Sequence, residues 1–180
     1  MFDLRRASEF MLRFPARVAS PLNLTTSASL LVFKSFVKTA CKNENRREPN
    51  TYFLLEHLFS EGKTVVTSRS DFNTKQMTHW AVSPDSLWQT NHYGIPEPNE
   101  GTLVLPSAID LVFVPLLGYD VKGQRVGYGH GFYDRFLTKC AQHAVFIGLS
   151  YFPPGPKIID SEPTDIRLNY CIHSEGIFRF

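Results

Sequence analysis

The sequence predicts one α/β domain over residues 1–180, with three layers, α/β/α, around a mostly parallel sheet. Predicted helices alternate with apolar strands along the chain, which is typical of α/β proteins. The strongest strand, AIDLVFVPLLGYD at 108–120, is continuously apolar at its centre, as expected where both faces of a parallel sheet are covered. A composition of 43% hydrophobic and 20% charged residues suits a single globular domain with a buried core. Ligands are then expected at the C-terminal ends of the strands.

Four elements are expected in the first half of the chain. Imperfect helical spacing predicts a weak helix over residues 4–13. The apolar run SLLVFKSFV at 29–37 suits either a buried strand or part of a helix, and the pattern does not decide between them. An apolar stripe closed by a glycine predicts a helix over 51–62. The β-branched residues of KTVVTSR, at 63–69, predict a strand directly after it.

The second half is expected to alternate between connections, strands and one helix. A stretch rich in Pro, Asn and Gly at 91–102 predicts a surface connection before the strong strand at 108–120. Residues 132–143 place apolar side chains on one helical face and predict a helix. AVFIGLS at 144–150 then predicts another buried strand.

Charge and cysteine content exclude several classes of protein. A formal net charge of +2 with scattered basic residues gives no indication of a nucleic-acid partner or a membrane-binding face. No apolar run approaches the roughly 20 residues that cross a bilayer. The three widely spaced cysteines predict reduced thiols and a cytoplasmic location. The Arg-, Ser- and Thr-bearing N-terminus also resembles a transit peptide, but Asp3 and Glu9 favour an ordinary first helix.

The stretch RVGYGHGFYDRF, residues 125–136, combines three glycines with an arginine and an aspartate. The alternating glycines allow positive φ and a close approach of the backbone to a ligand. The loop leads into a predicted helix, whose first N–H groups favour an anion. Arg125 can add a forked, charged donor to a bound phosphate.

Asp134 follows the third glycine, where its negative charge would repel a phosphate. A magnesium ion between the carboxylate and the phosphate oxygens turns this repulsion into a bridge. The loop therefore suits a nucleoside triphosphate that carries a divalent metal. For an isolated glycine-rich turn, the simpler interpretation is favoured, in which Asp134 caps its helix and the glycines make a tight turn.

The longer motif DLVFVPLLGYDVKGQRVGYGHGFYDRFL, residues 110–137, resembles the signature of the 5-formyltetrahydrofolate cyclo-ligase family, also called methenyltetrahydrofolate synthetases. Four further segments are similar to family elements in the same order. They are REPNT (47–51), GKTVVTSR (62–69), YGIPEP (93–98) and PTDIRLNYCI (163–172). The resemblance covers roughly residue 48 to the end, and a motif of this length is far more specific than three glycines.

The resemblance implies a Rossmann-like fold of the cyclo-ligase type and an enzyme that uses ATP and Mg²⁺. The implied reaction closes 5-formyltetrahydrofolate to 5,10-methenyltetrahydrofolate and releases ADP and phosphate. The implied partners are the folate and ATP alone, with no nucleic acid or membrane, and a monomer is expected. Positioning and charge neutralisation are expected to supply most of the catalysis.

The resemblance also implies a role for individual residues. ATP is expected to be bound by Arg5, Arg125, Val126, Gly127, Tyr128, Gly129, His130, Gly131, Phe132 and Tyr133. Within this group Tyr128, Gly129, His130, Gly131 and Phe132 also face the folate, and Glu48 binds the pterin ring. Asp134 and Asp165 are the implied magnesium ligands, and Arg125 and Asp134 the implied catalytic pair. Asp120 is interpreted as a structural residue that caps the turn before Lys122 and Gly123.

Residues 1–47 are atypical for the family. Family members carry a lysine four residues before the position of Arg5, and Met1 stands there in this chain. One alternative is therefore a non-catalytic relative that binds folate or nucleotide and has lost this ATP contact. A second alternative is an unrelated kinase-like or phosphate-binding domain that uses the same loop.

Overall fold

The structure is a computed structural model that describes residues 30–33, 51–157 and 162–180. The helix expected over residues 4–13 lies outside the described residues, as do Arg5 and Glu48. Among the described helices, none combines the length and the apolar character needed to cross a membrane.

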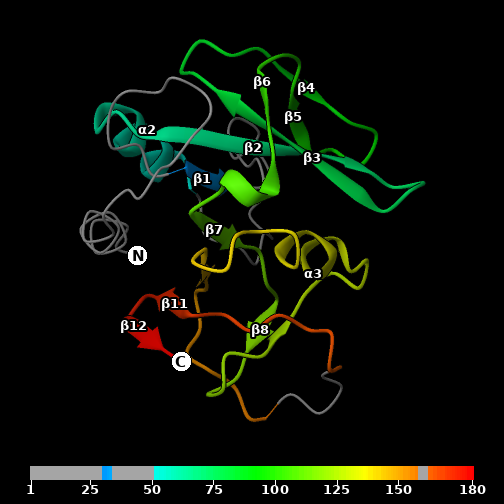
Figure 1. Cartoon of the computed structure of the whole chain (residues 1–180). Coiled ribbons are helices and arrows are strands. Elements are labelled where there is room, and N and C mark those ends of the chain that lie inside the picture. Colours follow the sequence, from blue (N-terminus) through cyan, green and yellow to red (C-terminus); the bar gives the residue numbers. More distant parts are fainter. Residues whose placement is uncertain (1–29, 34–50, 158–161) are drawn as a thin grey trace.

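The described elements are mostly strands, arranged in one large sheet and two small ones (Figure 1). In chain order they are β1 Leu30–Phe33, α2 Tyr52–Ser60, β2 Thr64–Asp71, β3 Gln76–Val82, β4 Trp88–Thr90, β5 Pro96–Pro98, β6 Thr102–Val104, the 3₁₀ helix η1 Pro106–Ala108, β7 Leu111–Val114, β8 Gly118–Tyr119, β9 Arg125–Val126, α3 Phe132–Leu137, β10 Val145–Leu149, β11 Tyr170–His173 and β12 Gly176–Arg179. Two-stranded sheets are formed by β4 with β5 and by β8 with β9.

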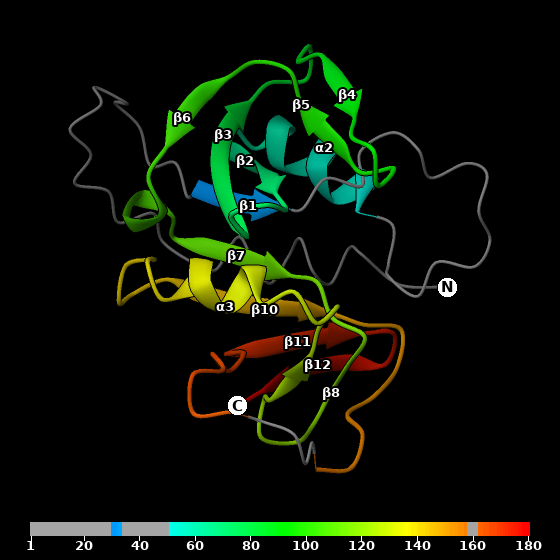
Figure 2. The same cartoon turned by 90° about the vertical axis from the view of Figure 1, so that its right-hand side faces the viewer.

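The large sheet is mixed. Its strand order is β12-β11-β10-β7-β1-β2-β3-β6 (Figure 2). The four pairings in the centre, from β11 to β2, are parallel, and the three outer pairings that involve β12, β3 and β6 are antiparallel. The predicted α/β class is confirmed, whereas a Rossmann-like, three-layer domain with a mostly parallel sheet is not, because short antiparallel hairpins extend the sheet at both ends.

Apolar side chains cover both faces of the central strands, so the sheet separates two cores. Val65 packs against the leucines of α2, whereas the next residue, Val66, packs in the core that contains the apolar side chains of α3. Leu111 and Val112 of β7 divide between the cores in the same way, since successive strand residues point to opposite faces. Figure 1 shows α2 and α3 on opposite sides of these strands.

Most predicted elements are confirmed, with differences in three regions. The strand predicted over 108–120 is shorter than expected, because β7 spans only Leu111–Val114 and Gly118–Tyr119 form β8 of another sheet. The run 29–37, left open between strand and helix, contains β1, and the helix at 51–62 and the strand at 63–69 are α2 and β2. The surface connection predicted over 91–102 is wrong in part, because β5 lies within it and all three of its residues are buried. The helix predicted over 132–143 ends at Leu137, where i to i+3 hydrogen bonds from Lys139 and Cys140 tighten the chain into a turn.

Two of the three cysteines, Cys140 and Cys171, are described, and both are free thiols. Burial raises the pKa of each to about 12, so both remain protonated and unreactive at neutral pH.

Gly148 in β10 lies where the α3-side core leaves no room for a side chain. A Cβ on Gly148 would lie 2.6 Å from Leu116 Cδ2 and 2.8 Å from Leu168 Cδ1. We expect Gly148→Ala to lower the free energy of unfolding by about 1–3 kcal/mol, because overpacking forces side chains and backbone to shift. Urea unfolding measures this, with Gly176→Ala as the control since its Cβ would meet nothing within 4 Å. Equal stability of the two variants would contradict the prediction.

Candidate functional site

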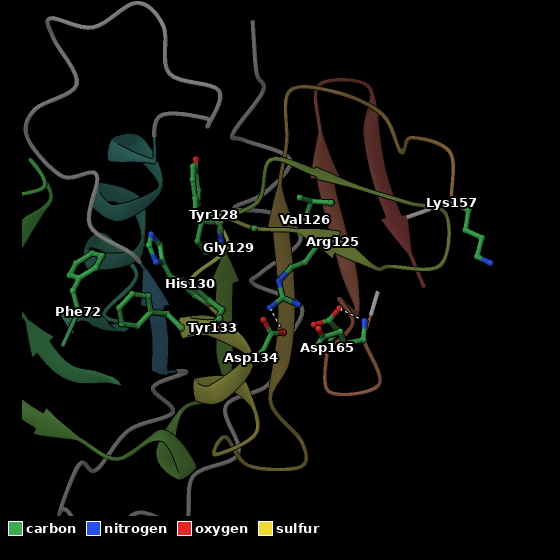
Figure 3. Close-up of a pocket in the computed structure, with 15 residues that line it drawn as sticks. Phe72, Arg125, Val126, Tyr128, Gly129, His130, Tyr133, Asp134, Lys157 and Asp165 are labelled. Carbon is green, nitrogen blue, oxygen red and sulfur yellow. Dashed lines mark hydrogen bonds and ion pairs between the residues drawn. The ribbon is translucent and has the colours of Figure 1, made fainter. Parts of the chain in front are cut away.

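A partly open cavity of about 690 Å³ lies beside the glycine loop (Figure 3). Its lining comes from five separate parts of the chain: Phe72, Pro115, Arg125, Val126, Gly127, Tyr128, Gly129, His130, Gly131, Phe132, Tyr133, Asp134, Lys157, Glu162 and Asp165. Pro115 directly follows the C-terminal end of β7. The cavity therefore lies at the end of the parallel strands where α/β proteins bind ligands.

The cavity has an aromatic end and a charged end. Figure 3 shows Phe72, Tyr128 and His130 toward one side, and Asp134, Asp165 and Lys157 toward the other. Such a shape suits a ligand pair with a flat ring at one end and charged oxygens at the other.

Asp120 fixes the hairpin that carries Arg125. Its Oδ1 accepts hydrogen bonds from the backbone N–H groups of Lys122 (2.9 Å) and Gln124 (3.0 Å), and the residue is only 1% exposed. Gly123, between these donors, has φ of 75° and so takes the turn without a Cβ penalty. The structural interpretation of Asp120 is confirmed.

The glycine loop turns through two residues with positive φ, Gly129 at 80° and Gly131 at 62°. A Cβ on Gly127 or Gly129 would meet no other atom within 4 Å, so the loop leaves open space on its surface beside the cavity. The helix that follows, α3, has only six residues. Its contribution to binding an anion is therefore smaller than the longer predicted helix would provide, and the loop's own N–H groups become more important.

We expect Gly129→Ala to weaken binding at the loop more than Gly127→Ala. Both positions have room for a methyl group, but only Gly129 has a positive φ, which costs a non-glycine residue about 1–2 kcal/mol. The measurement is nucleotide affinity in the presence of Mg²⁺, for the two variants side by side. Equal losses in both would show that backbone conformation at Gly129 does not matter for binding.

Arg125, Asp134 and the backbone of Ile166 form one connected cluster. The Arg125 Nη2 lies 2.8 Å from Asp134 Oδ1, and its Nη1 donates to the carbonyl oxygen of Ile166. The same Asp134 oxygen accepts the N–H of Ile166 at 3.2 Å. The Arg125 side chain is 5% exposed and that of Asp134 is 30% exposed. The cluster thus ties β9, the start of α3 and the turn that carries Asp165 to one another.

This arrangement brings the implied catalytic pair together, but in contact with each other. The Arg125 charge is balanced by Asp134, so the predicted contact of Arg125 with a phosphate requires the guanidinium to share or exchange its partner. Lys157 is another cation in the cavity lining, and it is exposed. The contact of Arg125 with a phosphate stays a prediction.

The carboxylates at the charged end fit a magnesium ion that is shared with a ligand. Asp134 and Asp165 both line the cavity, and Asp165 is held by the N–H of Glu162, which lies 2.8 Å from its Oδ2. Within the described ranges, no group of three or more His, Cys, Asp or Glu side chains is placed to hold a metal. Mg²⁺ commonly uses one or two carboxylates together with waters and substrate phosphates, and Asp134 and Asp165 would supply the carboxylates.

Sequence reasoning predicted part of this lining and missed part of it. The cavity contains Asp165 and the whole run from Arg125 to Asp134, as the resemblance implied, whereas Arg5 and Glu48 lie outside the described residues. The missed residues are Phe72, Pro115, Lys157 and Glu162. Pro115 lies within the motif at 110–137 but had no role assigned to it. The other three lie in connections with no local pattern to mark them, and only the tertiary fold brings them to the loop.

Comparisons with known proteins point to one family. Residues 20–150 match the 5-formyltetrahydrofolate cyclo-ligase family. A 5-formyltetrahydrofolate cyclo-ligase from Haemophilus influenzae is 31% identical over 125 residues, which are 67% of this chain and 67% of that protein. One from Mus musculus is 30% identical over 103 residues, and the match spans 53% of this chain but only about half, 51%, of the mouse protein.

Two solved structures have a similar fold. The 5,10-methenyltetrahydrofolate synthetase of Aquifex aeolicus gives a TM-score of 0.63 at 24% identity, over 84% of this chain and 71% of that one. The enzyme of the same name from Mycoplasma pneumoniae gives 0.59 at 18% identity, over 95% and 84%. At these identities the likeness concerns the fold.

Proposed function

Because the chain belongs to the 5-formyltetrahydrofolate cyclo-ligase family, we propose that it closes 5-formyltetrahydrofolate to 5,10-methenyltetrahydrofolate with ATP and Mg²⁺. ADP and phosphate are the other products. The observation that carries the proposal is the single cavity in which the glycine loop, Arg125, Asp134 and Asp165 converge. A monomer in the cytoplasm is part of the same proposal.

The proposed chemistry must convert the formyl oxygen into a leaving group. That oxygen attacks the γ-phosphorus of ATP, and ADP leaves. The N10 lone pair then attacks the formyl carbon, phosphate departs with the former formyl oxygen, and N10 loses its proton. Little covalent work falls to the protein, so its task is to hold the two substrates in line and to neutralise charge.

The charged end of the cavity is assigned to the triphosphate. The N–H groups of the glycine loop and the ammonium of Lys157 bind phosphate oxygens, and Arg125 holds the Asp134 carboxylate in a fixed orientation. The carboxylates of Asp134 and Asp165 would hold Mg²⁺, which would neutralise the charge that develops on the phosphoryl oxygens.

The aromatic end is assigned to the folate. Phe72 and Phe132 lie with ring centroids 5.1 Å apart in an edge-to-face arrangement, and His130 lies 5.8 Å from Phe72. These rings offer a flat pterin ring an apolar wall next to the loop that binds the phosphates. The Glu48 contact with the pterin and the Arg5 contact with ATP are proposed from the family motif alone.

The test is formation of the methenyl product, followed by its absorbance, from 5-formyltetrahydrofolate, ATP and Mg²⁺. Product that requires all three components supports the proposal. Tight folate binding without product would instead favour a non-catalytic relative. Nucleotide binding with no folate affinity would mean that this family member does not use a folate substrate.

A further inference from the structure

A buried carboxylate lies outside the cavity lining and has no part in the proposed reaction. Glu97, in the middle of β5, is 7% exposed. Its Oε1 accepts the backbone N–H of Ser70 at 2.9 Å and the Nδ2 of Asn91 at 3.0 Å. Arg69 fixes the same strand, because its Nε donates to the carbonyl oxygen of Pro98 at 2.6 Å. Glu97 is thus anchored to β2 on one side and bonded to the 91–95 turn on the other.

Asn91 connects Glu97 to the turn that follows it, because its side chain is hydrogen-bonded to both. Its Oδ1 accepts the backbone N–H groups of Tyr93 and Ile95, each at 3.0 Å. Two backbone hydrogen bonds, Asn91 N–H to Ile95 oxygen and Gly94 N–H to Asn91 oxygen, close the turn. With its Nδ2 on Glu97 and its Oδ1 on the turn, the Asn91 amide is fixed in one orientation.

Two rings of the turn, those of His92 and Tyr93, pack beside Phe72, which lines the aromatic end of the cavity. Tyr93 lies with its ring centroid 3.8 Å from that of His92 and 3.8 Å from that of Phe72. Phe72 lines the cavity and contacts the rings of His130 and Phe132 on the glycine loop. An unbroken series of contacts therefore runs from Glu97 through Asn91 and the turn to the cavity wall.

Burying a carboxylate in a strand costs free energy, because the carboxylate must be desolvated, and an apolar residue would fill the same space without this penalty. Its advantage here is a strong acceptor that fixes a backbone N–H and a side-chain amide at the same oxygen. The carboxylate is therefore better explained by a need to fix the position of the 91–95 turn than by stability alone.

We propose that Glu97 is a positioning residue that, through Asn91 and the rings of His92 and Tyr93, sets the position of Phe72 in the cavity wall for a flat heteroaromatic ligand ring. The inference rests on the proposed function, since the folate supplies that ring. It predicts an effect on the folate site and none on the nucleotide site.

The test uses variants that separate the hydrogen bonds from the charge. Asn91→Asp keeps the oxygen that accepts from Tyr93 and Ile95 but replaces the donor to Glu97 by a second carboxylate oxygen, which repels it. Glu97→Leu removes both hydrogen bonds of the acid. Glu97→Gln keeps the Oε1 acceptor for both donors, and Glu100→Gln changes an exposed acid on the same connection as a control.

The expected result is a KM for 5-formyltetrahydrofolate raised about tenfold or more in Asn91→Asp and Glu97→Leu, the size expected for losing a charge-assisted hydrogen bond. The KM for ATP and the Glu100→Gln control should stay at wild type, and Glu97→Gln, which keeps both hydrogen bonds without the charge, should raise the folate KM by less than Glu97→Leu does. Equal changes in both KM values, or a fall in kcat with neither KM changed, would overturn the proposal in favour of a general structural role.

Hydrogen exchange of the Tyr93 and Ile95 amides in the ligand-free protein tests the connection from Glu97 through Asn91 to the turn without any substrate. Faster exchange at these two amides in Asn91→Asp, with the exchange of β7 amides unchanged, supports positioning by Glu97. Unchanged exchange at Tyr93 and Ile95 overturns it. A wild-type protein that forms no methenyl product overturns the proposed function, and the exchange data still decide whether Glu97 holds the turn.

Discussion

Asp134→Asn is expected to lower kcat/KM for methenyl formation at least about tenfold, because a neutral amide is a poor ligand for Mg²⁺ and no longer compensates Arg125. The loss should be largest at low Mg²⁺ and should shrink partly as Mg²⁺ is raised. Absorbance of the product, followed across a Mg²⁺ titration for wild type and variant, measures both effects.

The matched control for this variant is Asp110→Asn. Asp110 also has a cationic partner when His143 is protonated, with Nε2 to Oδ1 at 3.0 Å, but it is not part of the cavity lining. It should leave the Mg²⁺ dependence unchanged. If Asp134→Asn retained wild-type kcat/KM at every Mg²⁺ concentration, the carboxylate would have no part in binding a metal, and the proposed reaction would lose its main support.

Arg125→Met is expected to lower both the stability of the ligand-free protein and its affinity for MgATP. The buried guanidinium holds Asp134 and the Ile166 carbonyl together, and losing such charge-assisted hydrogen bonds costs about 1.5–3 kcal/mol. Arg125→Lys should restore little of the stability or the affinity, because an ammonium lacks the planar, forked donors with which Arg125 reaches both Asp134 and the Ile166 carbonyl. Urea unfolding measures the stability, and calorimetry in Mg²⁺ measures the nucleotide affinity.

A double-mutant cycle with Asp134→Asn shows whether Arg125 acts through its carboxylate partner. The two substitutions together should destabilise the ligand-free protein by less than the sum of the single effects, since each alone leaves the other group without its ion pair. Strictly additive effects would mean that the 2.8 Å pair contributes nothing to the folded state.

Residues from one long motif were predictable, because their neighbours in sequence are also their neighbours in space. The family resemblance of residues 110–137 is confirmed, and that segment supplies β7, the β8–β9 hairpin, the glycine loop and α3. Local chemistry also sufficed for Asp120, because it accepts the N–H groups of Lys122 and Gln124, two and four residues further along the chain. The nucleotide, metal and folate contacts of the site residues stay predictions.

Contacts between distant segments were not predictable. Phe72 reaches the glycine loop only because the β2–β3 hairpin places it there, and β3 itself, QMTHWAV, lacks the apolar run that marked the central strands. The buried β5, with two prolines and an acid, has the composition of a surface loop, and Glu97 is tolerated inside only because Ser70 and Asn91 satisfy it. Such partners cannot be inferred from a short window of sequence.

The strand order described above also governs how the chain must fold. β1, at residues 30–33, lies between β2 and β7, and β7 begins only at residue 111. During synthesis the edge of β1 that pairs with β7 therefore stays unpaired while about 80 further residues are added, which takes seconds at ribosomal rates. Non-local parallel pairing of this kind slows folding and leaves an aggregation-prone intermediate. A chaperone that binds the N-terminal half during synthesis should therefore raise the yield of native protein.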